Sequence, residues 1–138
     1  MKHFSTIIKG IALVMLLLGV SEISAQNSDL KIYNGTDCYF ELVIYAYDCA
    51  PDDCTLGPVC IGPGLNLVHP CGGANLEWMS ADIVPTDADC NYCGVYGSTV
   101  ERVTSCGAGN TMSPFIGTCG ECGEVQVQFI GPDEILIQ

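Results

Sequence analysis

Positive charge is scarce in this chain. Its 138 residues include four Lys and Arg against sixteen Asp and Glu, which gives a formal net charge of −12. Lys2 and Lys9 lie near the N-terminus, so Lys31 and Arg102 are the only Lys or Arg residues beyond it. Phosphate backbones and anionic lipid headgroups are bound through Lys and Arg. We therefore expect no nucleic-acid partner and no anionic membrane surface as a partner.

The side chains of several catalytic mechanisms are also missing. After residue 25 the chain has one histidine, His69, and it has neither a Gly-x-Ser-x-Gly segment nor a Gly-rich loop ending in Lys. A Ser-His or Cys-His pair would have to use that one histidine, and phosphoryl transfer has no phosphate cradle. We predict that the protein is not an enzyme, and we assign no catalytic residue.

Long apolar runs are confined to the N-terminus. Residues 11–20 are apolar, follow a basic segment, and precede small residues ending at Ala25. This layout predicts a signal peptide, residues 1–25, and the run is too short to span a bilayer. Residues 26–138 then form one domain with a formal net charge of −13, because Lys2, Lys9 and Glu22 are removed. We expect a secreted or cell-envelope protein, extracellular or periplasmic, with no membrane insertion after cleavage.

Cysteine, in contrast, is abundant. An even number in a small exported chain predicts a framework of up to five disulfides. Close spacing favours local bridges within residues 49–54, 90–93 and 119–122. Cys38 is expected to reach a distant cysteine through the core, which would stabilise the fold by about 3–4 kcal/mol. The ten candidates are Cys38, Cys49, Cys54, Cys60, Cys71, Cys90, Cys93, Cys106, Cys119 and Cys122.

The clearest structural pattern lies in residues 30–48. Residues 30–34 and 38–48 read as two strands joined by a turn at Asn34-Gly35, which predicts a hairpin. In the second strand an apolar face alternates with a second face that carries Tyr39, Tyr45 and Tyr47. The apolar face, expected in the core, comprises Cys38, Phe40, Leu42, Ile44 and Ala46.

Further short strands are predicted along the rest of the chain. They cover residues 59–69 with a break at 62–64, then 74–84, 99–103, 111–117, and a C-terminal hairpin of 124–130 with 135–138. Residues 49–54 and 85–97 are expected to be loops because of their proline and acidic content. Seven or eight short strands without an amphipathic helix predict an all-β fold, an antiparallel β-sandwich of the Ig-like or a related kind.

A resemblance supports this interpretation. The signal segment ends in Ser-Ala-Gln, and it is followed by Asn34-Gly-Thr-Asp-Cys38, a tyrosine-rich strand, and Gly-Pro-Gly-Leu before Pro70-Cys71. In these features the chain resembles the small cysteine-rich exported proteins of Bacteroidetes-type bacteria. The resemblance implies export and a β fold, and it implies no catalytic residue.

Metal binding is the main alternative use of these side chains. Cys90-x-x-Cys93 and Cys119-x-x-Cys122 are spaced like the two knuckles of a zinc ribbon, although an exported protein favours disulfides. A thioredoxin-type redox role is disfavoured because strand-like residues follow Cys122. Asp87, Asp89 and Asn91 match the first ligand positions of a calcium loop, but Tyr92 stands where glycine is required. Acids that could complete a structural calcium site are Asp48, Asp52, Asp53, Asp82 and Glu101.

The tyrosines of the long strand are the remaining candidate contact residues. Tyrosine combines apolar area with a hydroxyl group, so Tyr39, Tyr45 and Tyr47 could contact a glycan or a protein, or simply pack within the sheet. Asn34-Gly-Thr36 also fits a glycosylation acceptor. Our first hypothesis is an exported interaction or surface-structural module. The alternatives are a small secreted enzyme or inhibitor, and a protein that binds calcium or, less favoured, zinc.

Overall fold

The computed structural model describes residues 28–47, 54–71, 76–104, 107, 109, 112–120 and 122–138. The predicted signal peptide, the loop of residues 49–53, and Cys49 and Cys106 lie outside the described residues, as do Asp48, Asp52 and Asp53. No helix in the described ranges is long and apolar enough to cross a membrane.

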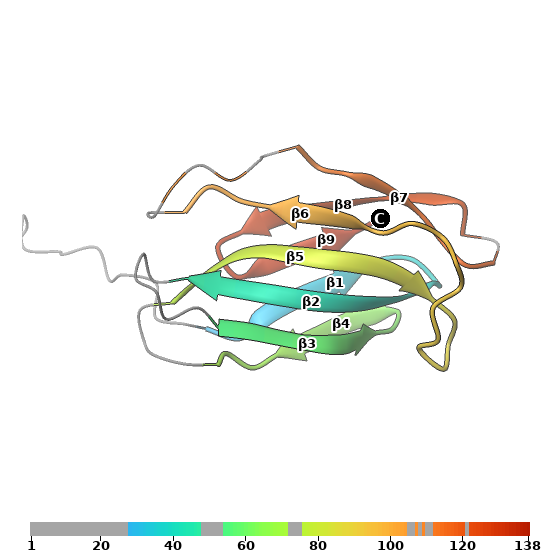
Figure 1. Ribbon diagram of the computed structural model, residues 1–138, viewed down its shortest axis with the longest axis horizontal. Helices are drawn as coiled ribbons and strands as arrows, with labels where there is room; N and C mark the ends of the chain where they lie inside the picture. Colours follow the sequence, from blue (N-terminus) through green and yellow to red (C-terminus); the bar gives the residue numbers. More distant parts are fainter. Residues whose placement is uncertain are drawn as a thin grey trace, which may run out of the picture.

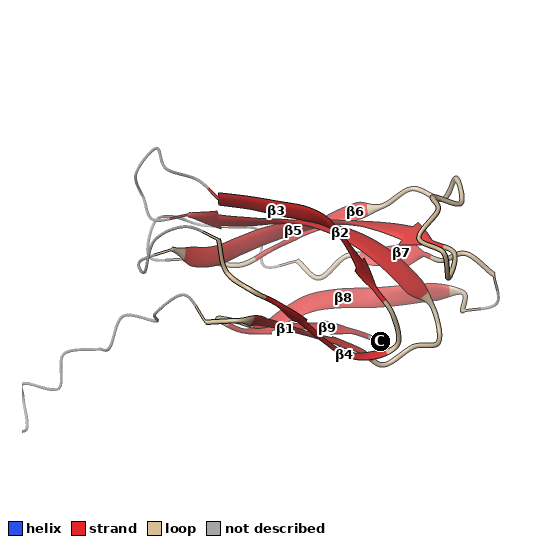
Figure 2. Ribbon diagram, turned by 90° about the horizontal axis from the view of Figure 1, so that it is seen from below, coloured by secondary structure: helices blue, strands red, loops and turns tan. Residues whose placement is uncertain are grey.

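The described chain folds as two β-sheets packed face to face, as Figures 1 and 2 show. One sheet has five strands in the order β4-β1-β9-β8-β7, and the other has four in the order β3-β2-β5-β6. All neighbours are antiparallel except β1 and β9, which are parallel. The predicted all-β sandwich is confirmed. The strands are β1 (Leu30–Asn34), β2 (Tyr39–Tyr47), β3 (Cys54–Ile61), β4 (Gly64–Val68), β5 (Glu77–Thr86), β6 (Ser98–Glu101), β7 (Phe115–Gly117), β8 (Glu124–Gly131) and β9 (Glu134–Ile137).

The core lies between the two sheets, and β2 contributes its centre. Phe40, Leu42, Ile44 and Ala46 are fully buried, as their alternation predicted. The same period of two places Leu30 and Ile32 of β1, and Ile135 and Ile137 of β9, on the inner face of the opposite sheet. Burial of such side chains stabilises the fold by roughly 1.5–3 kcal/mol each.

The predicted hairpin between the first two strands is wrong. β1 pairs with β4 and β9, whereas β2 pairs with β3 and β5, so the two strands belong to different sheets. The turn between them is held by Asn34, which is 3% exposed. Its Oδ1 accepts hydrogen bonds from the backbone N–H and the hydroxyl of Thr36, and its Nδ2 donates to the carbonyl oxygen of Cys38 at 2.7 Å. Asn34 is therefore a buried turn residue.

β5 alternates as predicted only up to a bulge. Tyr45 pairs with Ser80 and Ala46 with Trp78, which leaves Met79 as an extra residue on β5. A bulge of this kind resets the phase of a strand. Trp78 is therefore buried before it, and Ala81 and Ile83 are buried after it. The strand also continues through Pro85 to Thr86, beyond its predicted end at residue 84.

β3 begins at Cys54, earlier than the predicted strand at residue 59. It too is irregular, because its register against β2 shifts between Leu42 and Ile44. Gly57 lies at this irregularity with a φ of +131°, and a Cβ there would lie 2.6 Å from the carbonyl oxygen of Leu42. Glycine is needed because both the backbone angle and the space exclude a side chain. The predicted C-terminal hairpin is confirmed as β8 and β9.

Four disulfides cross-link the described cysteines, none of which is free. The pairs are Cys38–Cys122, Cys54–Cys71, Cys60–Cys90 and Cys93–Cys119, with Cα–Cα distances of 6.2, 5.9, 6.1 and 6.0 Å. The predicted long-range bridge from Cys38 is confirmed. The predicted local bridges are wrong, because Cys54, Cys90, Cys93, Cys119 and Cys122 all pair with more distant cysteines. Four disulfides in a small all-β protein indicate an oxidising, extracellular-type environment.

Three of these bridges form one closed covalent ring, here called the disulfide ring. It runs from Cys38 to Cys122, along the chain to Cys119, across to Cys93, along to Cys90, across to Cys60, and back along β3 and β2. The two Cys-x-x-Cys segments thus connect different parts of the fold. The three bridges of the ring lie near the end of the sandwich where β3 and β5 finish and β2 begins, on the right of Figure 1.

Candidate functional site on the outer face of the four-stranded sheet

The outer face of the four-stranded sheet carries the candidate tyrosines. Alternate residues of β2 point away from the core and are half-buried, and Figure 2 shows no described strand lying over them. The register brings outward residues of β5 and β6 alongside. We call this surface the tyrosine face: Tyr39, Glu41, Val43, Tyr45 and Tyr47 of β2, Glu77, Met79, Asp82 and Val84 of β5, and Thr99 and Glu101 of β6.

A ladder of hydrogen bonds crosses three strands of this face. The Tyr45 hydroxyl donates to Asp82 Oδ2 at 2.8 Å, and the Thr99 hydroxyl donates to Asp82 Oδ1 at 2.6 Å. The hydrogen bond to the Asp82 carboxylate raises the pKa of Tyr45 above its ordinary value, because the bond stabilises the protonated phenol. Tyr45 is therefore a protonated donor at neutral pH, and its ring is held across β5.

An open depression of about 260 Å³ adjoins this ladder. It is lined by Asp82, Ile83, Val84, Gly97, Ser98 and Thr99. Gly97 lies so close to the carbonyl oxygen of Ile83 that a Cβ would collide with it. Glycine at position 97 therefore lets the backbone before β6 pack directly against β5 at the edge of the depression. The depression thus offers polar oxygens beside an apolar side chain.

The three predicted contact tyrosines share this face but differ in their surroundings. A Cβ on Gly62 would lie 3.2 Å from Cε1 of Tyr39, so the Tyr39 ring packs over the backbone after β3. Tyr45 is fixed by Asp82, and Tyr47 pairs with Glu77 at the other end of β2. Tyr39 is therefore partly a packing residue. Tyr45 and Tyr47 are the better candidates for contact with another molecule.

The residues suggested for calcium lie in one turn, in which Asp87 accepts hydrogen bonds from Asp89 and Asn91. Asp87 Oδ1 accepts the backbone N–H groups of Asp89 and Asn91, both at 2.9 Å. The Asn91 side-chain amide also donates to Asp87, at 3.2 and 3.3 Å. These hydrogen bonds, led by the one from the Asn91 backbone, lower the pKa of Asp87. Across the described ranges, no three His, Cys, Asp or Glu residues are grouped to hold a metal ion.

The sulfurs considered for zinc or redox chemistry are bonded to other sulfurs. Cys90 and Cys93 pair with Cys60 and Cys119, and Cys122 pairs with Cys38, so none is available as a thiolate ligand. His69 lies after β4, a strand of the five-stranded sheet, with its imidazole 83% exposed and its Nδ1 3.0 Å from Asp29 Oδ1. This solvent-exposed pair is not part of the tyrosine face.

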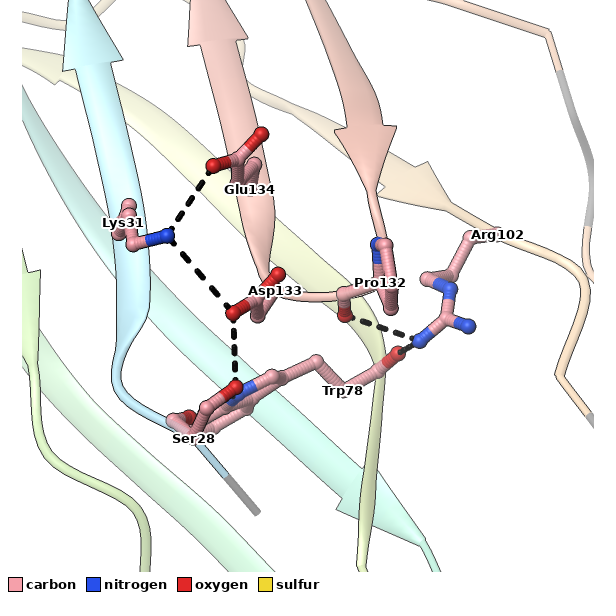
Figure 3. A network of polar contacts seen from close by, with 7 residues as sticks. All are labelled: Ser28, Lys31, Trp78, Arg102, Pro132, Asp133 and Glu134. Carbon is pink, nitrogen blue, oxygen red and sulfur yellow. Dashed lines mark hydrogen bonds and ion pairs between the residues drawn. The ribbon is translucent and has the colours of Figure 1, made fainter. Parts of the chain in front are cut away.

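Both of the described Lys and Arg residues are held by contacts within the chain (Figure 3). Lys31 lies 3.2 Å from Glu134 and 4.0 Å from Asp133, and the hydrogen bond to Glu134 raises its pKa. Arg102 Nη1 donates to the carbonyl oxygens of Trp78 and Pro132, at 2.8 and 3.0 Å. It thereby ties β5 to the turn between β8 and β9 and joins the two sheets.

Sequence reasoning does not identify Asp82, Thr99 and Gly97 as parts of one site. From sequence, Asp82 is only an additional calcium ligand, whereas in the structure it lies on the tyrosine face beside Tyr45. Its outward direction depends on the bulge at Met79, which reverses the alternation of β5. Tyr45 and Asp82 are almost forty residues apart, and nothing in the sequence indicates that they lie side by side. Their contact follows only from the register in which β2 pairs with β5.

The geometry is that of a flat aromatic and acidic sheet face with one shallow depression. Comparison of the chain with family models, with curated proteins and with solved structures finds no match.

Proposed function

We propose that this chain is an exported, non-enzymatic interaction module whose contact surface is the tyrosine face. The observation that carries the proposal is the position of Tyr45 and Tyr47 on a sheet face that no described strand covers. Tyrosine is enriched at contact surfaces because it offers a large rigid ring with a polar end. The Tyr45 ring is already ordered by Asp82, so less side-chain entropy is lost when a partner binds.

Two further observations support an exported module. The disulfide framework needs an oxidising compartment, and residues 1–25 have the layout of a cleaved signal. The tyrosine face is rigid because its strand β2 lies between β3 and β5 and begins at the disulfide ring. A rigid, uncovered face suits recognition of a partner.

Replacement of Tyr45 and Tyr47 by serine tests this proposal. The fluorescently labelled double variant should bind at least tenfold less to the surface and exported proteins of the source cells, because both rings and their anchored geometry are removed. Its stability should fall by about 1–2 kcal/mol, since a partly exposed hydrogen bond and partly exposed rings are lost. Binding is measured by retention on cells and unfolding by urea titration.

The matched control replaces Tyr92 and Tyr96, two exposed loop tyrosines, by serine. This variant carries the same chemical change and should bind as well as the unmodified protein. If the variant at Tyr45 and Tyr47 unfolds, or if both variants bind equally well, the tyrosine face is a packing surface and the proposal fails.

A further inference from the structure

The tyrosine face has an excess of negative charge. Glu41, Glu77, Asp82 and Glu101 lie on it, and Arg102 is the one Lys or Arg of the described chain at its border, where it lies 3.9 Å from Glu77. Arg102 is held by two backbone carbonyl oxygens, and Lys31 is engaged with Glu134 on the other sheet. Arg102 is thus the one described Lys or Arg side chain beside these four carboxylates, and the face keeps a negative charge that attracts cationic groups of another molecule.

Asp82 retains capacity to bind such a cation. Each of its oxygens accepts one hydrogen bond, from Tyr45 or from Thr99, and a carboxylate has about four acceptor positions in total. Asp82 is also one of the residues that line the depression of about 260 Å³. A planar guanidinium can donate two parallel hydrogen bonds to one carboxylate.

The aromatic groups of the face favour the same kind of ligand. Tyr45 is held next to Asp82, and a cation placed over the face of a tyrosine ring is attracted by the ring. Val84 offers apolar surface to the methylene stem of a long basic side chain. Glu41 extends the negative charge along β2, toward Val84, with which it pairs.

Building on the proposed function, we propose that the partner is a protein with a basic surface, and that one of its arginine side chains enters the depression beside Asp82. Charge complementarity selects this occupant. A chain with a formal net charge of −12 attracts a basic protein over a distance of about 10 Å at moderate salt, whereas a neutral glycan gains nothing from that field. The tyrosines then provide apolar contact around the ion pair.

The probe is a blocked peptide, acetyl-Gly-Arg-Gly-Arg-Gly-amide, added to the ¹⁵N-labelled protein. Its neutral counterpart contains citrulline in place of arginine, and cellohexaose serves as a neutral glycan. The arginine peptide should shift the amide resonances of β2, β5 and β6, and the citrulline peptide should bind at least tenfold more weakly. Raising the salt concentration from about 50 to about 300 mM should weaken binding of the arginine peptide severalfold.

Two charge-matched variants locate the site. Glu41→Gln with Asp82→Asn removes two charges from the face and should weaken binding of the arginine peptide at least tenfold. Asp89→Asn with Glu124→Gln removes two exposed charges elsewhere and should leave it within twofold. Glu41→Gln alone, which leaves the hydrogen bonds of Asp82 intact, should still weaken binding.

The outcomes separate this inference from the proposed function. Equal binding of the citrulline peptide, binding of cellohexaose to the face, or shifts spread equally over β1 and β9 would overturn the arginine inference and leave a contact face of different specificity. Absence of any shift on the face overturns it as well. The proposed function itself fails only if the serine substitutions at Tyr45 and Tyr47 unfold the protein or leave binding to the source material unchanged.

Discussion

At the scale of single residues, Gly57 shows how one backbone position constrains the four-stranded sheet. Gly57→Ala should destabilise the protein by about 2–4 kcal/mol, because a φ of +131° is unfavourable for alanine and the new methyl group would contact the backbone of β2. The free energy of unfolding is measured by urea titration.

Gly94→Ala is the matched control for this substitution. Gly94 has a φ of +81°, but a methyl group added there would have no atom within 4 Å, so its replacement should cost only about 1 kcal/mol. Equal losses of stability for Gly57→Ala and Gly94→Ala would show that the backbone at Leu42 moves away from the new methyl group without an energetic cost.

The shifted pKa values of Asp87 and Tyr45 predict how the stability of the protein depends on pH. The lowered pKa of Asp87 means that its contribution is fully present above the ordinary value of 3.8 and is lost as the pH falls through the lowered value. The raised pKa of Tyr45 means that its contribution is fully present below 10.0 and is lost as the pH rises through the raised value. Urea unfolding from about pH 2 to about pH 11 should show both losses.

Each loss has its own control variant. Asp87→Asn keeps an acceptor for the two backbone N–H groups but cannot ionise, so the acid loss should become smaller. Tyr45→Phe should reduce the alkaline loss without changing the acid one. Unchanged pH profiles in both variants would assign the pH dependence to other groups.

At the scale of elements, the disulfide ring makes three bridges energetically equivalent. The ring contains 22 chain steps between Cys38 and Cys60 and three in each Cys-x-x-Cys segment, so removing any one bridge opens a loop of about 28 residues. Each loss should destabilise the protein by about 3.5 kcal/mol on the loop-entropy model. The separation of 84 residues for Cys38–Cys122, taken alone, would predict about 4.5 kcal/mol.

Three double alanine variants measure this equivalence, one for each bridge of the ring. Their free energies of unfolding, determined by urea titration, should agree within about 0.5 kcal/mol. A loss about 1 kcal/mol larger for the Cys38 and Cys122 variant would show that the bridges act independently. Non-reducing peptide mapping of the unmodified protein should recover the four described pairs.

The strands themselves are predictable from sequence where their alternation is uninterrupted. Residues 39–47 alternate without a break, so the sequence correctly indicates both faces of β2. In β5 the extra residue Met79 exchanges the inward and outward positions of the residues that follow it. The sequence does not indicate where such a bulge occurs. The part of the tyrosine face that lies on β2 can therefore be predicted from the sequence. The acidic part that lies on β5 cannot be predicted.

At the scale of the whole molecule, prediction from sequence fails for the pairing of strands and of cysteines that are far apart in the chain. The Asn34-Gly35 turn suggests a hairpin because turn chemistry is local. In the structure the buried Asn34 side chain donates to the carbonyl oxygen of Cys38 across this turn, and β2 enters the other sheet. The Cys-x-x-Cys spacing likewise suggests local bridges. Once the sheets have packed, Cys90 and Cys93 lie against cysteines of other segments and bond to Cys60 and Cys119. Ten cysteines allow far too many pairings for sequence spacing to predict these.

The parallel pairing of β1 with β9 has a mechanical consequence for the whole molecule. Tension applied to the start of β1 and the end of β9 would slide the two strands past each other. The hydrogen bonds that join residues 31–35 to residues 133–137 would then be loaded together and not one after another. The Cys38–Cys122 bridge would then carry the force past the 84 residues that separate its cysteines. Under load, the protein would act as a short, stiff link and not as an extensible spring.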